Sequence, residues 1–555
     1  MTKLSTDSET IASSQPLTRR RALAHTGAAL AALSGVVMST RPSVALAQEA
    51  SPPADEPPAA DVTGGVTAER ARLAVERLPA LAETILQQSG VPGMAVAVVF
   101  DDALTYSGGF GVRELGKERA IDADTVFQLA SVSKSLAATV VSSVVGDGVV
   151  AWQSRMADLA PGFALHDAWP TQNVSLADLF AHRSGLLDHA GDLLEDLGFD
   201  REEVLHRLRY LEPAYSFREG YEYTNFGLTA AAVAVAQVVG MSWEELSAER
   251  LYDPLGMTHT SSRFADYMAE PNRAIPHVKD GDSWVVTPKQ RDPDAQSPAG
   301  GVSSTARELA QWMRLQLGQG NFEGQQLIPA AALAPMHLPQ AVSNVPPDPA
   351  TQRAGFYGLG SNVSYTDFGA VQWSHSGAFG SGAATAYYLL PGSDFGVLVL
   401  TNGAPVGAPE ALCLSVLDLA TTGSITRDWL AFVGPRMAAA MDEDTYGTEA
   451  DWNTPPADAT PSAPNAAYLG TYRNDYYGDA EIAQAADGLA LRIGPKPLEF
   501  PLTHFDRDTF SWQPAGENAV GRSGLTFLIG ADGTAVAFRD DYLAMDDAGV
   551  LLRSG

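Results

Sequence analysis

A serine and a lysine stand three residues apart at the start of a long apolar segment, in Ser131-Val132-Ser133-Lys134. Residues three apart on a helix share one face, so the Ser131 hydroxyl and the Lys134 amine are expected side by side. A hydroxyl becomes a good nucleophile when a base takes its proton, and an amine buried by apolar neighbours can be that base. None of the other five lysines has a serine three residues before it.

Two further motifs follow along the chain, Tyr223-Thr224-Asn225 and His375-Ser376-Gly377. Neither is specific by itself, because Tyr472-Arg473-Asn474 and His189-Ala190-Gly191 repeat the same spacings. The prediction therefore depends on the order of the three motifs along the chain and on the segments around them, and the residue identities of a single motif are not enough.

In that order and setting the motifs resemble the serine β-lactamase and penicillin-binding protein clan, closest to its class C-like branch. That branch includes D-aminopeptidases, family VIII esterases and related serine peptidases. The resemblance spans roughly Leu73 to Ala420, and His182, inside one supporting phrase, is interpreted as a structural histidine before a turn. Four supporting phrases stand at the expected places: Val174 to Leu186, Leu251 to Met257, Pro298 to Val302 and Tyr357 to Gly360.

The resemblance implies catalytic roles for three side chains. Ser131 is the nucleophile, at a helix N-terminus where the helix dipole favours developing negative charge. Lys134 is the base, since burial lowers the pKa of an amine. Tyr223 passes a proton to the leaving group and later activates the deacylating water.

The resemblance also implies how substrate is held. Asn225, His375 and Gly377 are substrate-binding residues, and the backbone N–H groups of Ser131 and Ala378 form the oxyanion hole. The β-lactamases and penicillin-binding proteins usually have lysine where this chain has His375. Histidine is only partly charged near neutral pH and holds a carboxylate less firmly, which favours the peptidase-like members.

The composition limits the other readings. A chain of 555 residues with 45% hydrophobic residues is expected to form two or three domains. Its formal charge of −30 opposes binding to nucleic acid and to anionic membranes. The single cysteine, Cys413, excludes an intrachain disulfide. No Gly-x-Ser-x-Gly or His-Glu-x-x-His motif occurs, so neither an α/β-hydrolase elbow nor a metal or other cofactor is expected.

The N-terminus has the features of an export signal. Thr18-Arg19-Arg20-Arg21 resembles a twin-arginine motif, and Ala45-Leu46-Ala47 supplies small residues for cleavage before Gln48. Residues 1–47 are predicted to be the signal, and the Pro/Ala-rich residues 48–66 a disordered linker. The mature protein is expected in the periplasm or secreted, without an integral membrane span.

Hydrophobic patterning predicts one main domain over residues 67–423. It opens with a helix and two strands and closes with two strands and a helix, which one antiparallel sheet would unite. The predicted fold class is α/β (α+β), with a sheet flanked by helices and a helical subdomain, as in β-lactamases and transpeptidases. The predicted elements are a helix over 67–88, strands over 93–100, 104–110, 382–390 and 395–401, and helices over 127–145, 230–240 and 408–420.

The tail has a different pattern. Residues 424–465 are predicted to be a helical segment with a Pro-rich linker, and residues 466–555 a small all-β, barrel-like domain with Asp-Gly turns. Its predicted strands cover residues 481–483, 489–493, 499–502, 509–512, 525–529 and 535–538. This tail is similar to the lipocalin-like domain attached to some of these hydrolases. It is expected either to shape the cleft or to mediate assembly into a homo-oligomer.

The sequence thus favours an exported serine hydrolase that forms an acyl-enzyme on Ser131 and cleaves amide bonds of small peptides or modified amino acids. Two alternatives stay open. One is a carboxylesterase that uses the same residues, and the other is a non-hydrolytic binding or sensing protein on the same fold. Each takes a small molecule or a peptide as its ligand.

Overall fold

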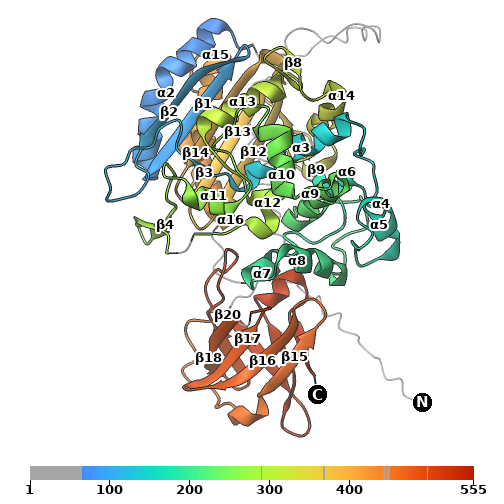
Figure 1. The fold of residues 1–555 in the computed structure, drawn as a ribbon. Coiled ribbons are helices and arrows are strands. Elements are labelled where there is room, and N and C mark those ends of the chain that lie inside the picture. Colours follow the sequence, from blue (N-terminus) through green and yellow to red (C-terminus); the bar gives the residue numbers. More distant parts are fainter. Residues whose placement is uncertain are drawn as a thin grey trace, which may run out of the picture.

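The computed structural model describes residues 65–288, 290–366, 369–441, 446, 450–496 and 498–554. The predicted signal and nearly all of the predicted linker lie outside these residues. The described chain forms a large mixed domain and a separate barrel of strands, joined by the segment that follows the last long helix (Figure 1). This arrangement confirms the predicted fold class.

The mixed domain is built on one antiparallel sheet of eight strands, in the order β2-β1-β14-β13-β12-β11-β10-β9. As predicted, strands from the two ends of the domain are neighbours, since Met94 of β1 pairs with Thr401 of β14. The strands are β1 (Gly93–Phe100), β2 (Ala103–Gly111), β9 (Ala341–Asn344), β10 (Gly355–Tyr357), β11 (Asn362–Tyr365), β12 (Val371–Phe379), β13 (Ala383–Leu390) and β14 (Phe395–Thr401).

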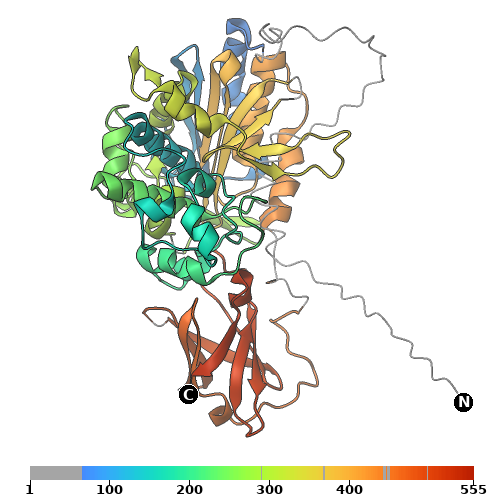
Figure 2. The same ribbon diagram turned by 90° about the vertical axis from the view of Figure 1, so that its right-hand side faces the viewer.

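Both faces of this sheet are buried, which explains why its central strands are apolar runs rather than alternating ones. Successive side chains point to opposite faces, so Val96 and Val98 join a cluster with α2 (Ala68–Ser89), α15 (Ala408–Thr422) and α16 (Trp429–Met441). Ala95, Ala97 and Val99 point the other way, into the larger core. Figure 2 shows the sheet between these two layers.

The larger core lies under α13 (Ala306–Leu317) and the helical subdomain. Its central helices are α3 (Ser133–Gly146) and α9 (Asn225–Val239), and both are buried over most of their length. Shorter helices surround them: α4 (Met156–Leu159), α5 (Ala168–Asn173), α6 (Leu176–Phe180), α7 (Asp192–Asp196), α8 (Arg201–Arg207), α10 (Trp243–Ser247), α11 (Phe264–Ala269), α12 (Ser297–Gly300) and α14 (Ala330–Leu333).

The sequence patterns predicted four of the eight strands and missed β9 to β12. β12 reads Val-Gln-Trp-Ser-His-Ser-Gly-Ala-Phe, a mixture of polar and apolar residues with no period of two. Helix α9 also begins earlier than predicted, at residue 225 instead of 230. In both places polar residues interrupt the hydrophobic pattern, and His375 of β12 and Asn225 of α9 are the ones that lie near Lys134.

The tail is a closed barrel of eight antiparallel strands. Six of them were predicted, and the two that were missed, β15 and β22, close the barrel by pairing Thr471 with Ser554. Aromatic rings fill the interior, among them Tyr472, Phe527 and Phe538, as expected for so narrow a barrel. The strands are β15 (Gly470–Asn474), β16 (Gly478–Ala485), β17 (Gly488–Ile493), β18 (Leu498–Asp506), β19 (Thr509–Trp512), β20 (Ser523–Ile529), β21 (Ala535–Asp540) and β22 (Val550–Ser554).

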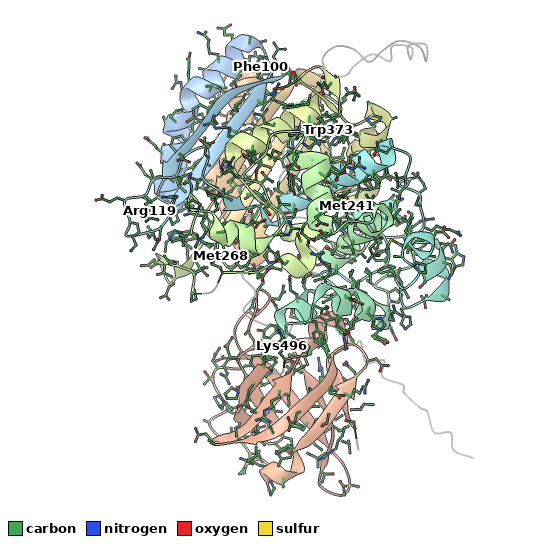
Figure 3. All side chains as sticks on the ribbon, viewed as in Figure 1. Phe100, Arg119, Met241, Met268, Trp373 and Lys496 are labelled. Atoms are coloured by element: carbon green, nitrogen blue, oxygen red, sulfur yellow. The ribbon has the colours of Figure 1, made fainter. Side chains whose placement is uncertain are left out.

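The barrel is docked on the helical subdomain rather than tethered beside it. The backbone N–H of Gly191 donates to the Tyr476 hydroxyl at 3.0 Å, and Arg207 donates to the Tyr476 carbonyl at 2.7 Å. In the turn after β17, a Cβ at Gly494 would lie 2.4 Å from the Leu197 carbonyl oxygen, so only glycine permits this approach. Figure 3 labels Lys496 in that turn, at the barrel end nearest the mixed domain.

One buried acid makes the stability of the mixed domain depend on pH. Glu410 is 1% exposed in the first turn of α15, and burial raises its pKa to about 7, against a hydrogen bond from Ser376. Between pH about 4.5 and about 7 the unfolded carboxyl ionises before the folded one. The free energy of unfolding therefore decreases as pH rises through this window, by about 3 kcal/mol.

We expect Glu410→Gln to be close to wild type in stability at pH 5 and more stable than wild type at pH 8. Glutamine resembles the protonated acid and cannot ionise. Urea unfolding at both pH values measures the difference, and Glu249→Gln, at a half-exposed surface position, is the matched control. An equal effect of Glu410→Gln at the two pH values would contradict the assignment.

Candidate active site

The predicted nucleophile lies at a break in the backbone between two elements. Strand β3 (Phe127–Gln128) leads into a single 3-10 turn, η2 (Ala130–Val132), and α3 follows at once. Ala130 has φ of 47°, in the left-handed region that a side chain disfavours. Such strain costs about 1–3 kcal/mol and persists where the surrounding structure imposes it. Here it turns Ser131 to the start of α3.

The amine of Lys134 is surrounded by three oxygen atoms. Its Nζ lies 3.1 Å from Ser131 Oγ, 2.6 Å from Asn225 Oδ1 and 2.9 Å from the carbonyl oxygen of Ala299 in α12. The amide and carbonyl oxygens only accept hydrogen bonds, whereas the hydroxyl can also donate. A neutral amine, with two N–H donors and one lone pair, matches this set with the lone pair facing the serine.

Burial keeps Lys134 neutral. The side chain is 0% exposed, and this burial holds the pKa of its amine well below the usual value. The carboxylate of Asp192 opposes the shift and the guanidinium of Arg291 adds to it. The amine is therefore available as a base at neutral pH.

Tyr223, from the loop before α9, completes the set beside Ser131. Its ring lies under the Lys134 amine, with Nζ 4.6 Å from the ring centroid, and its hydroxyl is hydrogen-bonded to Ser131. Burial raises its pKa far above the usual value, so the hydroxyl keeps its proton at neutral pH. Ser131 and Lys134 are neighbours on one turn, Tyr223 comes from a distant segment, and the fold brings all three into contact.

The predicted oxyanion hole lies where β12 passes η2. β11 pairs only with residues 371–374 of β12. Beyond these residues, the edge of β12 opposite β13 is not paired with β11, and Ala378 lies in this part of the strand. A Cβ at Gly377 would lie 2.2 Å from the Leu129 carbonyl oxygen and 2.9 Å from the Ser131 nitrogen. Glycine at 377 is thus required to bring this strand beside the nucleophile.

His375 lies in the same strand but offers no positive charge. Its Nδ1 faces the Ser376 carbonyl oxygen at 2.7 Å, which can only accept, and its Nε2 lies 2.8 Å from the Tyr357 hydroxyl. Burial, reinforced by the nearby Lys134, lowers its pKa to about 3. The imidazole is neutral and both of its nitrogens are occupied.

His182 is also close to the site, in a structural role. Its Nδ1 accepts the backbone N–H of Thr224 at 3.2 Å, and its ring packs on Tyr223 with centroids 4.6 Å apart. Burial holds its pKa well below the usual value. This neutral histidine supports the backbone that presents Tyr223.

Asn225 occupies the first turn of α9 and links two elements. Its Oδ1 accepts from Lys134, and its Nδ2 donates to Asp192 Oδ2 at 2.7 Å. The same carboxylate oxygen faces Nδ1 of His189 at 2.7 Å. Contact of Asn225 with substrate stays a prediction.

A loop of the barrel reaches this part of the molecule. The Glu517 carboxylate accepts the backbone N–H of Gly380, two residues after Ala378, and lies 3.6 Å from Arg291. Gly380 is the first residue of the turn after β12, so Glu517 holds this turn next to the strand that carries Ala378. Arg291 in turn stacks 4.5 Å above the Phe379 ring and pairs with Glu195 at 2.8 Å.

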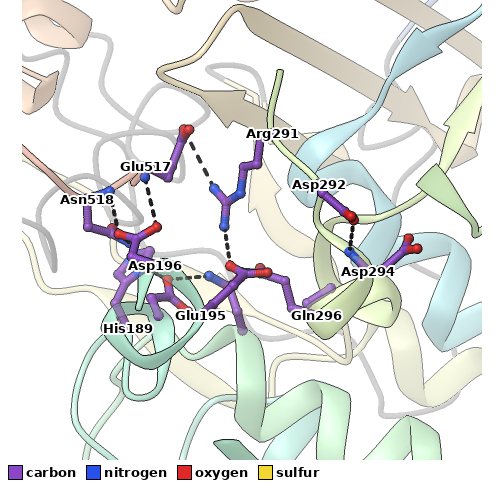
Figure 4. Close-up of polar contacts among 12 residues, drawn as sticks. His189, Glu195, Asp196, Arg291, Asp292, Asp294, Gln296, Glu517 and Asn518 are labelled. Atoms are coloured by element: carbon purple, nitrogen blue, oxygen red, sulfur yellow. Dashed lines mark hydrogen bonds and ion pairs between the residues drawn. The ribbon is translucent and has the colours of Figure 1, made fainter. Parts of the chain in front are cut away.

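Asp196 of α7 holds that loop in place (Figure 4). Its carboxylate accepts the backbone N–H groups of Glu517 and Asn518 at 2.8 and 2.9 Å, and the Asn518 side-chain amide at 2.9 Å. Burial raises its pKa, although Arg291 and these donors oppose the shift. The barrel is thereby part of the wall around the candidate site.

The sequence patterns missed this surrounding layer. His189 was noted only as a second His-x-Gly match, and no pattern pointed to Asp192, Arg291 or Glu517. The available signal was the acidic stretch from Asp188 to Asp196, in a chain whose acidic residues are too common for a cluster to stand out.

In the part of the chain that the structure describes, no group of three or more His, Cys, Asp or Glu side chains could hold a metal ion. Within the same ranges no single helix is long and apolar enough to cross a membrane. Asn225–Val239 and Trp243–Tyr252 meet the length and composition criteria only as a pair, bent by 83°.

Comparison with known families agrees with this geometry. The family model described as Beta-lactamase matches residues 78–422, and a domain of unknown function (DUF3471) matches residues 454–549. The first match covers the mixed domain and the second covers the barrel with the segment before it.

Individual proteins show the same likeness. The unguisins hydrolase ungD of Aspergillus violaceofuscus (strain CBS 115571) is 27% identical over 433 residues, 72% of this chain and 75% of that protein. Penicillin-binding protein 4 of Amycolatopsis lactamdurans is 29% identical over 327 residues, 56% of this chain and 81% of that protein. The structure of the octameric penicillin-binding protein homologue from Pyrococcus abyssi has the same fold, with a TM-score of 0.54 and 17% identity over 86% of this chain and all of that one.

Two substitutions separate a base at position 134 from a fixed positive charge. Lys134→Met removes the amine, and Lys134→Arg supplies a cation that does not lose its proton. We expect both to slow acylation of Ser131 by about 10²–10⁴-fold, the usual contribution of a general base. Stopped-flow acylation rates test this, and a Lys134→Arg variant with more than about a tenth of the wild-type rate would contradict the assignment as base.

Asp196→Ala is expected to loosen the barrel. Three N–H donors lose a buried acceptor, and each unsatisfied donor costs about 1–3 kcal/mol. We expect a lower midpoint of urea unfolding and faster protease cleavage in residues 514–518. Asp200→Ala removes a comparable aspartate, the exposed N-cap of α8, and is the matched control. Equal effects of the two variants would show that Asp196 does not hold the loop.

Proposed function

Since the chain belongs to the β-lactamase family and is a serine hydrolase, we propose that it cleaves amide bonds of small peptides or modified amino acids through an acyl-enzyme on Ser131. The observation that carries the proposal is the Lys134 amine, held 3.1 Å from the Ser131 hydroxyl by two acceptors that leave its lone pair for the serine. A charged lysine in ordinary contact with solvent could not act in this way.

Acylation follows from these contacts. Lys134 takes the Ser131 proton while Oγ bonds to the substrate carbonyl carbon, and the carbonyl oxygen becomes negative. The backbone N–H groups of Ser131 and Ala378 stabilise that charge, and each such donor is worth about 10²–10³ in rate. The C–N bond then breaks, and the leaving nitrogen takes the Tyr223 proton. The Lys134 ammonium returns a proton to Tyr223, so both groups end as they began.

Deacylation reverses the proton path with water as the nucleophile. The neutral Lys134 amine takes the Tyr223 proton while the Tyr223 oxygen takes a proton from water, and the water oxygen attacks the ester carbonyl carbon, so Lys134 then holds the proton that Ser131 needs. The Ser131–acyl bond breaks, Ser131 Oγ takes a proton back, and the acid product leaves. The step needs no group beyond those already in contact.

Charge around the cleft supports an amide substrate without a carboxylate beside the scissile bond. His375 is neutral, whereas the β-lactamases and penicillin-binding proteins usually place a lysine there. Arg291 is the nearby cation, and Glu195 and Glu517 already face it. A substrate carboxylate would meet acidic groups at this edge, so a β-lactam or a peptide C-terminus is a poor fit.

Export completes the proposal. The twin-arginine-like segment and the small residues before Gln48 support transport of the folded protein to the periplasm or the medium. The enzyme then meets peptides and modified amino acids outside the cytoplasm. Immunoblots of cell fractions, with Arg19 and Arg20 both changed to lysine as the comparison, test this part separately.

A substrate screen tests the reaction itself. Purified protein is offered D- and L-amino acid amides, short p-nitrophenyl esters and a chromogenic β-lactam, with Ser131→Ala as the control. We expect turnover of amides and a loss of at least about 10³-fold in Ser131→Ala. Hydrolysis of esters alone would favour a carboxylesterase, and stoichiometric acylation without turnover would favour a binding or sensing protein. Activity retained by Ser131→Ala would refute the nucleophile.

A further inference from the structure

Helix α7 carries a buried carboxylate that the reaction described above does not use. Asp192 is 3% exposed, and its Oδ2 accepts from Asn225 Nδ2 and from His189 Nδ1, each at 2.7 Å. Asn225 Oδ1 accepts from Lys134 Nζ at 2.6 Å. A continuous chain of hydrogen bonds therefore runs from His189 through Asp192 and Asn225 to the amine.

We propose that Asp192 is a positioning residue for the reaction: it fixes the Asn225 amide with Oδ1 toward Lys134, and its charge stabilises the ammonium that Lys134 becomes when it takes the Ser131 proton. The inference rests on the proposed function, because it concerns the same proton transfer. Asp192 itself exchanges no proton and touches no substrate.

The orientation of the Asn225 side chain follows from the different hydrogen-bonding properties of the two ends of its amide group. With the amide reversed, Oδ1 of Asn225 would face the Asp192 carboxylate and its NH₂ would face the N–H groups of Lys134. The contact with Asp192 would be repulsive, and the amide NH₂ could bind Lys134 only by taking up the lone pair of its neutral amine. The carboxylate thus selects the orientation in which Lys134 donates to Asn225 and keeps its lone pair for Ser131.

The stabilisation of the Lys134 ammonium by Asp192 follows from charge balance. Acylation moves one proton from Ser131 to Lys134 and so creates a positive charge in a fully buried place. Asp192 raises the pKa of that amine, and Arg291, in the segment before α12, lowers it. The positive charge on Lys134 therefore forms near the Asp192 carboxylate, which is linked to the amine through the Asn225 amide.

The other titratable groups around Lys134 do not take this role. Burial lowers the pKa of His182 and of His375, so both stay neutral. Burial opposes charge on His189, but Asp188 and Asp192 together raise its pKa. The groups that face the amine are His182, His189, Tyr223, His375, Asp192 and Arg291, with Asp188 behind His189.

A pH profile separates this role from a structural one. Only the neutral Lys134 amine accepts the Ser131 proton, so the rate of acylation rises with pH through the pKa of Lys134. Asp192→Asn removes the charge that raises this pKa, and the rising limb should move to lower pH. The plateau should fall about tenfold or more, because the remaining amine is a weaker base. A loosened fold would lower the plateau and leave the limb in place.

The experiment measures labelling of Ser131 by a fluorophosphonate at a series of pH values. Ser131 Oγ bonds to phosphorus, fluoride leaves, and Lys134 takes the hydroxyl proton. Asp192→Glu keeps the charge and should retain the wild-type limb with a lower plateau. Leu194→Ala, buried in the same helix, perturbs α7 without changing charge and should leave the limb unmoved.

Each outcome decides one question. The inference is supported if the rising limb of the pH profile moves to lower pH in Asp192→Asn and stays in place in Asp192→Glu and Leu194→Ala. An unmoved limb in folded Asp192→Asn, checked by circular dichroism, overturns it. If Asp192→Asn does not fold, a moved limb in Asp192→Glu overturns it and an unmoved one supports it. Wild-type protein that is not labelled at Ser131 overturns the proposed function, and the inference with it.

Discussion

The site depends on keeping one amine uncharged inside the protein. Desolvating a charged ammonium is expensive, so a fully buried lysine gives up its proton instead of staying charged. The fold meets this constraint with two apolar helices, α3 and α9, and with acceptors that a neutral amine can satisfy. The hydrophobic core and the chemistry are thus one arrangement: the residues that exclude water from Lys134 also make it a base.

The same constraint explains why the groups around the amine are neutral or paired. His182 and His375 lose their charge by burial, and Tyr223 keeps its proton for the same reason. The acidic side chains of α7 are paired: Asp192 faces Asn225, and Glu195, whose pKa burial raises to about 7, faces Arg291. This short helix therefore separates the uncharged interior of the site from its charged wall.

Residue spacing was enough to predict the parts of the fold whose pattern is local. The central strands β1, β13 and β14 are long apolar runs, and the nucleophile and base are neighbours on one turn. β12 escaped prediction because polar residues break its hydrophobic pattern. β15 and β22 escaped because each is five residues long with only one buried residue, which is too short a pattern to show a period of two.

The surrounding layer of the site could not be predicted for a related reason. Asp192, Arg291 and Glu517 act through contacts between residues 33, 96 and 226 positions apart in the chain. Charged residues are common on the surface of an acidic protein, so residue type alone does not distinguish these three from other surface positions. The motifs predict which groups react, and only the folded chain shows which side chains surround those groups.

The docking of Glu517 on Gly380 has a consequence for how the molecule is made. Ser131, Lys134 and Tyr223 leave the ribosome several hundred residues before the loop that borders their cleft. A nascent chain that already contains Ser131, Lys134 and Tyr223 therefore still lacks the contact that holds the turn after β12. That contact forms only once residue 517 has been synthesised, so the surroundings of the candidate site are completed late.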